Sequence, residues 1–381
     1  MLKKIQFPHL PIAQKKLDRI HLFATIAIVG LLAFSIASAY WSLLPPRKDL
    51  YNELWGPAYL LVHHQSPYDT ASLNAELRAA WFPMAIGLFF PIGWLSESAA
   101  LYTWFCFGLF QIGAIVLLAQ QSYKPAYLTL FTAIFAFAFP STIYHLLLGQ
   151  ISLTATLATV LALIFLKKEK HWASAFFLAV GLIKPHLLTV TMLGLSLWYL
   201  RRGGVRSVIL FWARVMLWVL VLCLPLFIAY PNWIPDAVES MRTNTHWSFP
   251  TLLNLLSMTL GLWGKIIWAV LFVATLSLGV YLWNKLEPVR ATYCSLGLAL
   301  LITPYMGSWD FVVLLPLLVF TFAKSNWKQR IFILLSYGLA WYGMALVQAM
   351  PNSHNRFFWW VPVWFLGTLL PIILAKRQQP E

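Results

Sequence analysis

Acidic residues are scarce in this sequence. Only 12 Asp and Glu occur among 381 residues, and charged residues of both signs make up 10% of the chain. Soluble domains carry roughly 25% charged residues. Because 60% of the residues are hydrophobic, with 20 Trp and 27 Phe, the composition excludes a soluble protein. We therefore expect a single integral membrane domain over residues 1–381.

Cysteine is also rare. Cys106, Cys223 and Cys294 lie in apolar segments, and their spacing fits neither a disulfide framework nor a metal site. The net charge of +15 comes from short basic runs between apolar segments. That distribution is typical of membrane proteins rather than of proteins that bind nucleic acid. The outer loops hold too few clustered carboxylates for a divalent cation, so we predict no metal and no cofactor.

The basic runs predict the orientation of the chain. The loops on one side, together with both termini, hold 18 Lys or Arg and 4 acidic residues. The loops on the other side hold 5 Lys or Arg and 8 acidic residues. This bias places the termini in the cytoplasm, with a basic lead-in over 1–19 and outer loops at 45–80 and 231–257. A first apolar stretch near 20–44 is too long for a signal peptide and should remain as an anchor. We expect a multi-pass protein of a bacterial plasma membrane.

Apolar segments follow closely from Trp81 onward, and several have only about 13–16 residues. A full span needs about 20, so we expect short helices that end at a water-filled cavity. The fold class predicted is an all-α polytopic bundle of about 12 crossings, with segment 81–96 re-entrant. Short interfacial helices are expected in the outer loops, around Leu54–His64, Ser72–Ala80 and Asp236–Met241. The apolar segments are 81–96, 100–120, 126–148, 151–166, 172–184, 186–200, 207–230, 258–284, 291–304, 311–323, 331–350 and 361–375.

Charged groups at membrane depth are costly and therefore informative. Lys184 precedes Pro185 between two short apolar arms that both return to basic runs. It should lie at the outer end of a helical hairpin, where an ammonium group can bind phosphate. The alternative is a lysine that snorkels to the interface, which is also the simpler interpretation of Arg214 and Lys265.

Other polar groups fall at outer helix ends. Gln150 can hydrogen-bond a sugar hydroxyl or cap a helix, and Asp310 can act in a site or complement a helix dipole. His246, Trp247 and Ser248 can contact a sugar ring, although Trp is also expected in interfacial belts. Asp49 lies in the predicted first outer loop. It is either part of a functional site or one of the polar residues that a water-exposed loop tolerates. If all of them face one outward cavity, they suit a reaction on a phosphate-linked sugar.

Short motifs recur along the chain in a fixed order. They are Asp49-x-Tyr51, Gly56-x-x-Tyr59, Ser66-Pro67-Tyr68, Phe82-Pro83 with Pro91, Gly149-Gln150, Ala179-x-Gly181, Lys184-Pro185, Thr303-Pro304-Tyr305 and Trp309-Asp310. In order and membrane side this set resembles glycosyltransferase family 87, over roughly residues 20–375. The sequence departs from the family pattern in two places. Where the family has Gly-Gln-x-Asn, this chain has Gly149-Gln150-Ile151-Ser152. Where the family has Asn-Gln-Ser, this chain has His246-Trp247-Ser248.

The resemblance implies a GT-C fold and a hexosyltransferase. Such an enzyme moves a hexose from a polyprenyl-phosphate donor to a lipid or glycan acceptor on the extracytoplasmic face. The first candidate for the hexose is mannose, and the configuration at its anomeric carbon is inverted. The resemblance implies Asp49 as general base, with Glu53 in reserve one helical turn on. Lys184 supplies the positive charge for the leaving phosphate, with His186 beside it. The expected sugar- and acceptor-binding residues are Tyr51, Gln150, His246, Trp247, Ser248, Trp309 and Asp310.

Two other functions remain open from the sequence. A transporter or flippase for lipid-linked sugars would use Lys184 as an anion site, but transporters tend to show paired repeats, and none is visible here. A non-catalytic subunit of an envelope-assembly pathway would require the outer polar residues to have gathered by chance.

Overall fold

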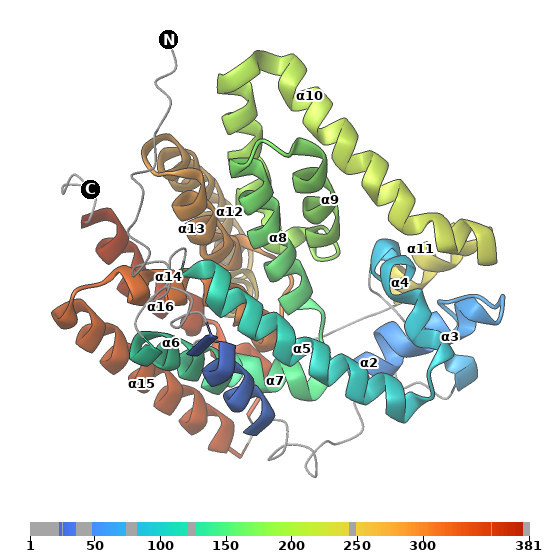
Figure 1. The fold of residues 1–381 in the computed structure, drawn as a ribbon, viewed down its shortest axis with the longest axis horizontal. Coiled ribbons are helices and arrows are strands. Elements are labelled where there is room, and N and C mark those ends of the chain that lie inside the picture. The colour runs from blue at the N-terminus through green and yellow to red at the C-terminus, as the bar shows by residue number, and fades with distance from the viewer. Residues whose placement is uncertain are drawn as a thin grey trace.

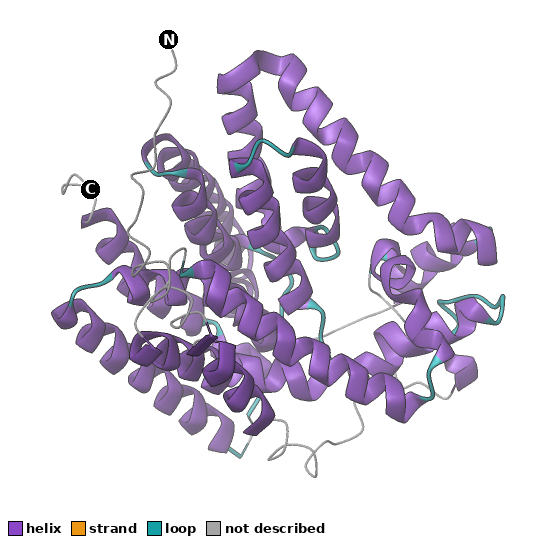
Figure 2. Cartoon of the chain, in the orientation of Figure 1, coloured by secondary structure: helices purple, strands orange, loops and turns teal. Residues whose placement is uncertain are grey.

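The computed structural model describes residues 23–24, 26–35, 48–73, 82–120, 126–243, 249–351 and 353–375. Every regular element in these ranges is a helix, and no strand occurs in them (Figure 2). The all-helical prediction is therefore confirmed. The predicted residues His246, Trp247 and Ser248 lie outside the described residues, as do residues 74–80 and the basic lead-in over 1–19.

Five helices are long and apolar enough to cross a membrane, or six if α6 and α7 form one bent span. These helices indicate an integral membrane protein. The predicted total of about 12 crossings stays a prediction, because the remaining apolar helices are shorter than a full span. The spans are α5 (Glu97–Ala119), α10 (Thr189–Ala229) with the preceding η4 (Pro185–Leu188), α12 (Leu252–Lys285), α15 (Trp327–Ala349) and α16 (Trp360–Ala375) with η6 (Asn355–Phe358).

Short helices form the centre of the bundle. The hairpin of α8 and α9 packs against α5 and α10, and α13 packs against α10, α12, α14 and α16 (Figure 1). Nearly every side chain of α13 and α14 is buried, from Val289 to Ala323. The central helices are α6 (Ala126–Ala138), α7 (Pro140–Leu148), α8 (Ser152–Lys167), α9 (His171–Gly181), α13 (Pro288–Ile302), η5 (Ser308–Leu314) and α14 (Leu315–Lys324).

The long helices α10, α12 and α15 expose apolar side chains on the outside of the bundle, including Ile228, Trp263 and Leu335. Apolar helices exposed in this way suit contact with lipid. Helix α10 changes direction at Gly203 and Gly204, where Gly204 has φ +66° (Figure 1). The bend divides α10 into two arms that correspond to the predicted segments 186–200 and 207–230, with the basic run at the bend.

The segment predicted as the first outer loop contains α2 (Lys48–Leu50), the π-helix η1 (Tyr51–Trp55), α3 (Gly56–Val62) and the 3-10 helix η2 (Thr70–Leu73). The helix predicted around Leu54–His64 is thus confirmed to Val62. Its inner side is buried against η3 (Phe90–Trp94) and α4 (Pro83–Phe89). Within segment 81–96, α4 passes directly into the 3-10 helix η3, which contains Pro91. The re-entrant course of this segment stays a prediction. The helix predicted around Asp236–Met241 is α11 (Trp233–Thr243).

Candidate active site

Four buried polar side chains from distant parts of the chain meet at one end of the short helices. Asp49 comes from α2, Gln150 from the turn between α7 and α8, Lys184 from the turn after α9, and Asp310 from η5. Each is less than 7% exposed. Buried charged groups are rare unless they are paired, so this cluster is the strongest site candidate among the described residues.

The four side chains form one hydrogen-bonded chain. Gln150 Nε2 donates to Asp49 Oδ2 at 2.6 Å, and Gln150 Oε1 accepts from Lys184 Nζ at 3.0 Å. Lys184 Nζ also donates to Asp310 Oδ1 at 2.6 Å, which makes a buried ion pair. Gln150 therefore orients the Asp49 carboxylate and the Lys184 ammonium at once. Two of the three ammonium hydrogens of Lys184 are used in this way, and no third acceptor is seen among the described residues.

Asp310 is the most enclosed member of the cluster. Besides the ammonium group, Asp310 accepts hydrogen bonds from the Ser152 hydroxyl and, at 2.8 Å, from the Gly307 backbone N–H. Ser152 opens α8, so this contact joins two helix starts. The sequence reasoning gave Ser152 no role, although it had marked that position as a departure from the family pattern.

Gly149 lets the site close. It ends α7 with φ +71°, a conformation that favours glycine. A Cβ atom at Gly149 would lie 2.6 Å from the Cβ of Leu50, the residue after Asp49. The turn that carries Gln150 can thus approach the helix that carries Asp49 only because residue 149 has no side chain.

We expect Gly149→Ala to destabilise the protein by about 1–3 kcal/mol, because alanine is strained in this conformation, with a further cost from the contact with Leu50. Thermal melting in detergent would measure the loss. Gly338→Ala is the matched control, since a Cβ there meets no atom within 4 Å. Equal melting temperatures for the two variants would contradict the expectation.

The two carboxylates of the cluster differ in their acidity. Burial raises the pKa of Asp49 above its usual range, although the Gln150 hydrogen bond and the Lys184 charge oppose that effect. For Asp310, burial also acts upward, but Lys184, His186 and the Ser152 hydrogen bond outweigh it and lower the pKa. Asp310 is therefore held as an anion, whereas Asp49 is the better proton acceptor.

Several buried polar atoms near the cluster have no hydrogen-bond partner among the described groups. They include Asn52 Nδ2, His145 Nδ1 and His186 Nε2. Buried polar groups are normally satisfied by protein, water or a ligand. Asn52 lies three residues after Asp49, on the same side of the helix. Water or a polar ligand could therefore satisfy these atoms.

Tyr305 lies at the edge of this region and was not among the predicted site residues. Tyr305 is 46% exposed as a residue, and its ring packs edge-on against the rings of His186 and Phe249, with centroid separations of 5.2 and 4.6 Å. Burial around the hydroxyl, and then the charges of Asp310, Glu53 and Asp49, raise the pKa of Tyr305. Its place in the motif Thr303-Pro304-Tyr305 was the signal available in the sequence.

The structure places the other predicted residues around the cluster. Glu53 is buried one turn after Asp49 on η1. Trp309 is half-buried, and its ring packs over Gly307, where a Cβ would lie 2.1 Å from it. Tyr51 points away from the cluster, since its hydroxyl donates to the Leu73 carbonyl at 2.9 Å. In the described ranges no three His, Cys, Asp or Glu are grouped to hold a metal ion.

The basic runs lie at the other end of the short helices. Lys167 Nζ and Glu287 Oε1 are 2.6 Å apart and join the turn after α8 to the turn before α13. Ser152, at the opposite end of α8, contacts Asp310 in the cluster. The length of α8, about 24 Å for 16 residues, therefore separates the polar cluster from the basic turns.

The sequence profile of glycosyltransferase family 87 matches residues 82–304. This chain belongs to glycosyltransferase family 87. The match confirms the family that the motifs resembled, and the protein is therefore a glycosyltransferase and an enzyme. No curated protein matches the chain significantly. Gln150 and Lys184 fall within the family 87 match, whereas Asp49 and Asp310 lie outside it on either side, so the fold rather than the match joins them.

Proposed function

We propose that this family 87 protein is an inverting hexosyltransferase of GT-C type. Its donor would be a polyprenyl-phosphate sugar, with mannose the first candidate, and its acceptor a lipid or glycan. One observation carries the proposal: the Asp49 carboxylate, whose pKa is raised, is joined through Gln150 to the buried ammonium of Lys184.

The reaction needs one base and one cation. The acceptor hydroxyl attacks the anomeric carbon, and Asp49 takes its proton. The bond between that carbon and the phosphate oxygen breaks, and the oxygen leaves with the electron pair. Because the leaving phosphate is already acidic, it needs positive charge rather than a proton donor. The third hydrogen of Lys184 is available for that oxygen, and His186 lies beside it.

Asp310 takes a different part in this scheme from the sugar contact expected from the sequence. Its low pKa keeps a negative charge beside Lys184, and the ion pair with Asp310 at 2.6 Å fixes the position of the ammonium group. A donor phosphate near Lys184 would bring a second negative charge close to Asp49. That charge would raise the pKa of Asp49 further and make Asp49 a stronger base once the donor is bound.

The separation of the cluster from the basic turns supports an extracytoplasmic site. Basic turns face the cytoplasm by the positive-inside rule, and the cluster lies about one short helix away from them. A donor with a long lipid chain suits a site at helix ends, where its head can leave the hydrocarbon. On this scheme both termini are cytoplasmic.

The function is tested by transfer of a radiolabelled sugar. Purified protein would be mixed with polyprenyl-phosphate mannose and a membrane lipid extract, and label in the extracted lipids and glycans would be followed. We expect transfer that depends on the protein. Movement of the donor between leaflets without any transfer, from every polyprenyl donor tried, would favour a flippase instead.

The pH dependence of transfer tests the proposed base. Asp49 must be deprotonated to act, so the rate should rise with pH through its pKa, which lies above the ordinary value of 3.8. Gln150→Leu removes a hydrogen bond that lowers this pKa. The acid limb of kcat/KM should therefore move to higher pH in the variant. An unchanged limb would show that another group is the base.

A further inference from the structure

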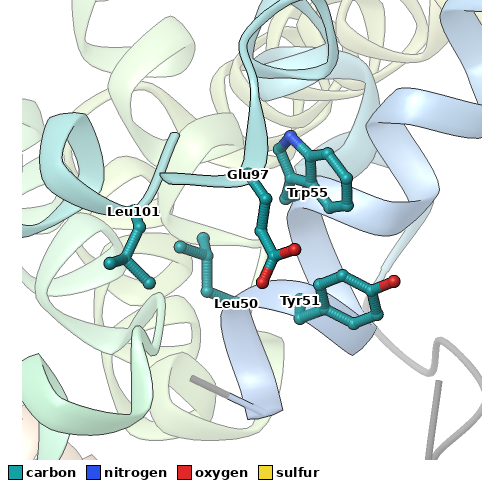
Figure 3. A pocket seen from close by; sticks show the side chains of 5 residues that line it. All are labelled: Leu50, Tyr51, Trp55, Glu97 and Leu101. Atoms are coloured by element: carbon teal, nitrogen blue, oxygen red, sulfur yellow. The ribbon is translucent and has the colours of Figure 1, made fainter. Parts of the chain in front are cut away.

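The two ends of the short helices differ in the room they leave for a further ligand. Near the catalytic cluster, Figure 3 shows a hollow beside Glu97, Leu50 and Tyr51. Its volume is about 10 Å³, the room of one water molecule, so it admits no larger ligand. At the opposite end, the bend of α10 projects beyond the turn that joins α8 to α9 (Figure 1), and residues 200–206 at this bend are all exposed.

Two arginines near the bend rest on tryptophan rings. The guanidinium carbon of Arg202 lies 4.1 Å from the centre of the Trp198 ring, one turn back on the first arm of α10. The guanidinium carbon of Arg214, on the second arm, lies 5.4 Å from the centre of the Trp172 ring, in the first turn of α9. Both distances suit cation–π contacts. Such a contact uses the flat face of a guanidinium group and leaves its edge, which carries the N–H donors, for an anion.

The protein does not compensate the charge of these arginines. In the described part of the chain no carboxylate forms an ion pair with Arg202 or Arg214. Glu169, the acidic residue of the turn before α9, is exposed and pairs with neither. Arg214 is half-buried and belongs to a candidate membrane span. A cation in that position is costly unless an anion accompanies it, so the contact with Trp172 leaves a counter-ion to be supplied.

Tyr199 lies between the two arginines. Its hydroxyl is 2.8 Å from His171 Nδ1, at the start of α9, and its ring stacks on Phe211 of the second arm with centroids 4.3 Å apart. The charges of Arg202 and Arg214 both act on this hydroxyl, so both guanidinium groups lie in its neighbourhood. Tyr199 thus ties α9 and both arms of α10 together at the place where the two charges gather.

Apolar side chains continue the Arg214 side of the second arm, away from the bend. Leu217 and Val221 follow Arg214 by three and seven residues, which places them on the same side of the helix, and both are exposed. An unpaired cation above exposed hydrocarbon suits a phospholipid, because the phosphate of a phospholipid lies directly above its acyl chains. A phosphate ester from solution would leave Leu217 and Val221 uncovered.

We propose that Arg202 and Arg214 bind the phosphate of an anionic phospholipid, whose acyl chains lie along Leu217 and Val221. The lipid belongs to the leaflet that faces the basic turns. Guanidinium groups bind phosphate oxygens through paired N–H donors, and basic sites between membrane helices bind anionic headgroups. This inference goes beyond the proposed function, because the site lies at the opposite end of α8 from the catalytic cluster.

The surroundings select the charge of the headgroup. Arg206 at the bend and Lys170 just before α9 are both exposed and add positive charge on the same side of the molecule. These charges repel the ammonium group of a zwitterionic lipid and attract a headgroup with a net negative charge. Phosphatidylglycerol should therefore bind in preference to phosphatidylcholine.

Native mass spectrometry of the full chain, released from detergent, tests the inference. Phosphatidylglycerol or phosphatidylcholine with the same acyl chains would be added, and the dissociation constant of the first bound lipid measured. We expect phosphatidylglycerol to bind about tenfold more tightly than phosphatidylcholine. Arg214→Gln should weaken phosphatidylglycerol binding about tenfold, the size expected for lost hydrogen bonds to a charged group. Equal binding of the two lipids by the wild type would overturn the proposal.

A second variant and a matched control make the result specific. Arg202→Gln changes an exposed residue, so it should keep the melting temperature of the wild type and still weaken phosphatidylglycerol binding. Lys328 also rests on a tryptophan ring, with its Nζ 5.6 Å from the centre of the Trp327 ring, and is exposed at the start of α15. Lys328→Gln removes the same charge elsewhere and should leave binding unchanged. The proposal is wrong if Lys328→Gln weakens binding as much as the arginine variants, or if Arg202→Gln binds like the wild type.

Two other occupants would give different results. Inorganic phosphate that displaces phosphatidylglycerol at equal concentration would show a site for soluble phosphate and overturn the proposal. The double variant Lys184→Met, Asp310→Asn alters the catalytic cluster alone and should bind phosphatidylglycerol like the wild type. Loss of binding in that variant would place the lipid at the catalytic cluster instead.

Discussion

Asp49→Asn should reduce sugar transfer by about 10²- to 10⁴-fold, the usual contribution of a general base. Asparagine has nearly the same shape, and its side-chain oxygen can still accept from Gln150 Nε2, which bonds to Asp49 at 2.6 Å. The Lys184–Asp310 ion pair does not involve residue 49, so the fold should be retained. Initial rates of label transfer, measured beside thermal melting, would separate loss of activity from loss of structure.

Asp69→Asn is the control for this variant. Asp69 lies in the same segment, 20 residues after Asp49, and is exposed, and its substitution should leave transfer unchanged. If Asp49→Asn transfers sugar as well as the wild type, the base lies elsewhere. Glu53→Gln would then be the next variant, because Glu53 is buried one turn away and its charge acts on Tyr305.

Lys184→Met should destabilise the protein by about 3–5 kcal/mol, because it leaves the Asp310 carboxylate buried without its counter-ion. Asp310→Asn should destabilise it for the same reason, with Lys184 then the unpaired charge. The double variant removes both charges and should recover much of the loss. Thermal melting of the four proteins in detergent, analysed as a double-mutant cycle, gives the coupling between the two residues.

Activity distinguishes this ion pair from a purely structural one. The double variant should be folded yet should not bind a polyprenyl-phosphate sugar, since the ammonium that faces the leaving phosphate is gone. Donor affinity equal to that of the wild type would show that Lys184 serves only the fold. Additive losses in the single variants would contradict the pairing at 2.6 Å.

Several features of this protein followed from local pattern alone. The length and composition of the apolar segments predicted helices at 100–120, 151–166 and 291–304, where α5, α8 and α13 lie. Pro185, placed between two short apolar arms, predicted the turn at Lys184. Scarce polar residues at helix ends also marked Asp49, Gln150, Lys184 and Asp310, because charge in an apolar chain is costly.

The exact number of crossings could not be predicted in the same way. Segments such as α8 and α9 are apolar but shorter than a span, and a hydrophobic pattern cannot distinguish a short crossing helix from one that turns back.

The sequence by itself determined that this is a helical, apolar protein of glycosyltransferase family 87, with its polar side chains at helix ends. Only the tertiary structure decided which of these side chains meet. Asp49 and Gln150 are 101 residues apart, and Lys184 and Asp310 are 126 apart. Local patterns specify helices, whereas contacts over such distances depend on how the helices pack, including the close approach that Gly149 allows. The packing of the helices therefore places Gln150 between Asp49 and Lys184, and Asp310 beside Lys184 as its ion-pair partner.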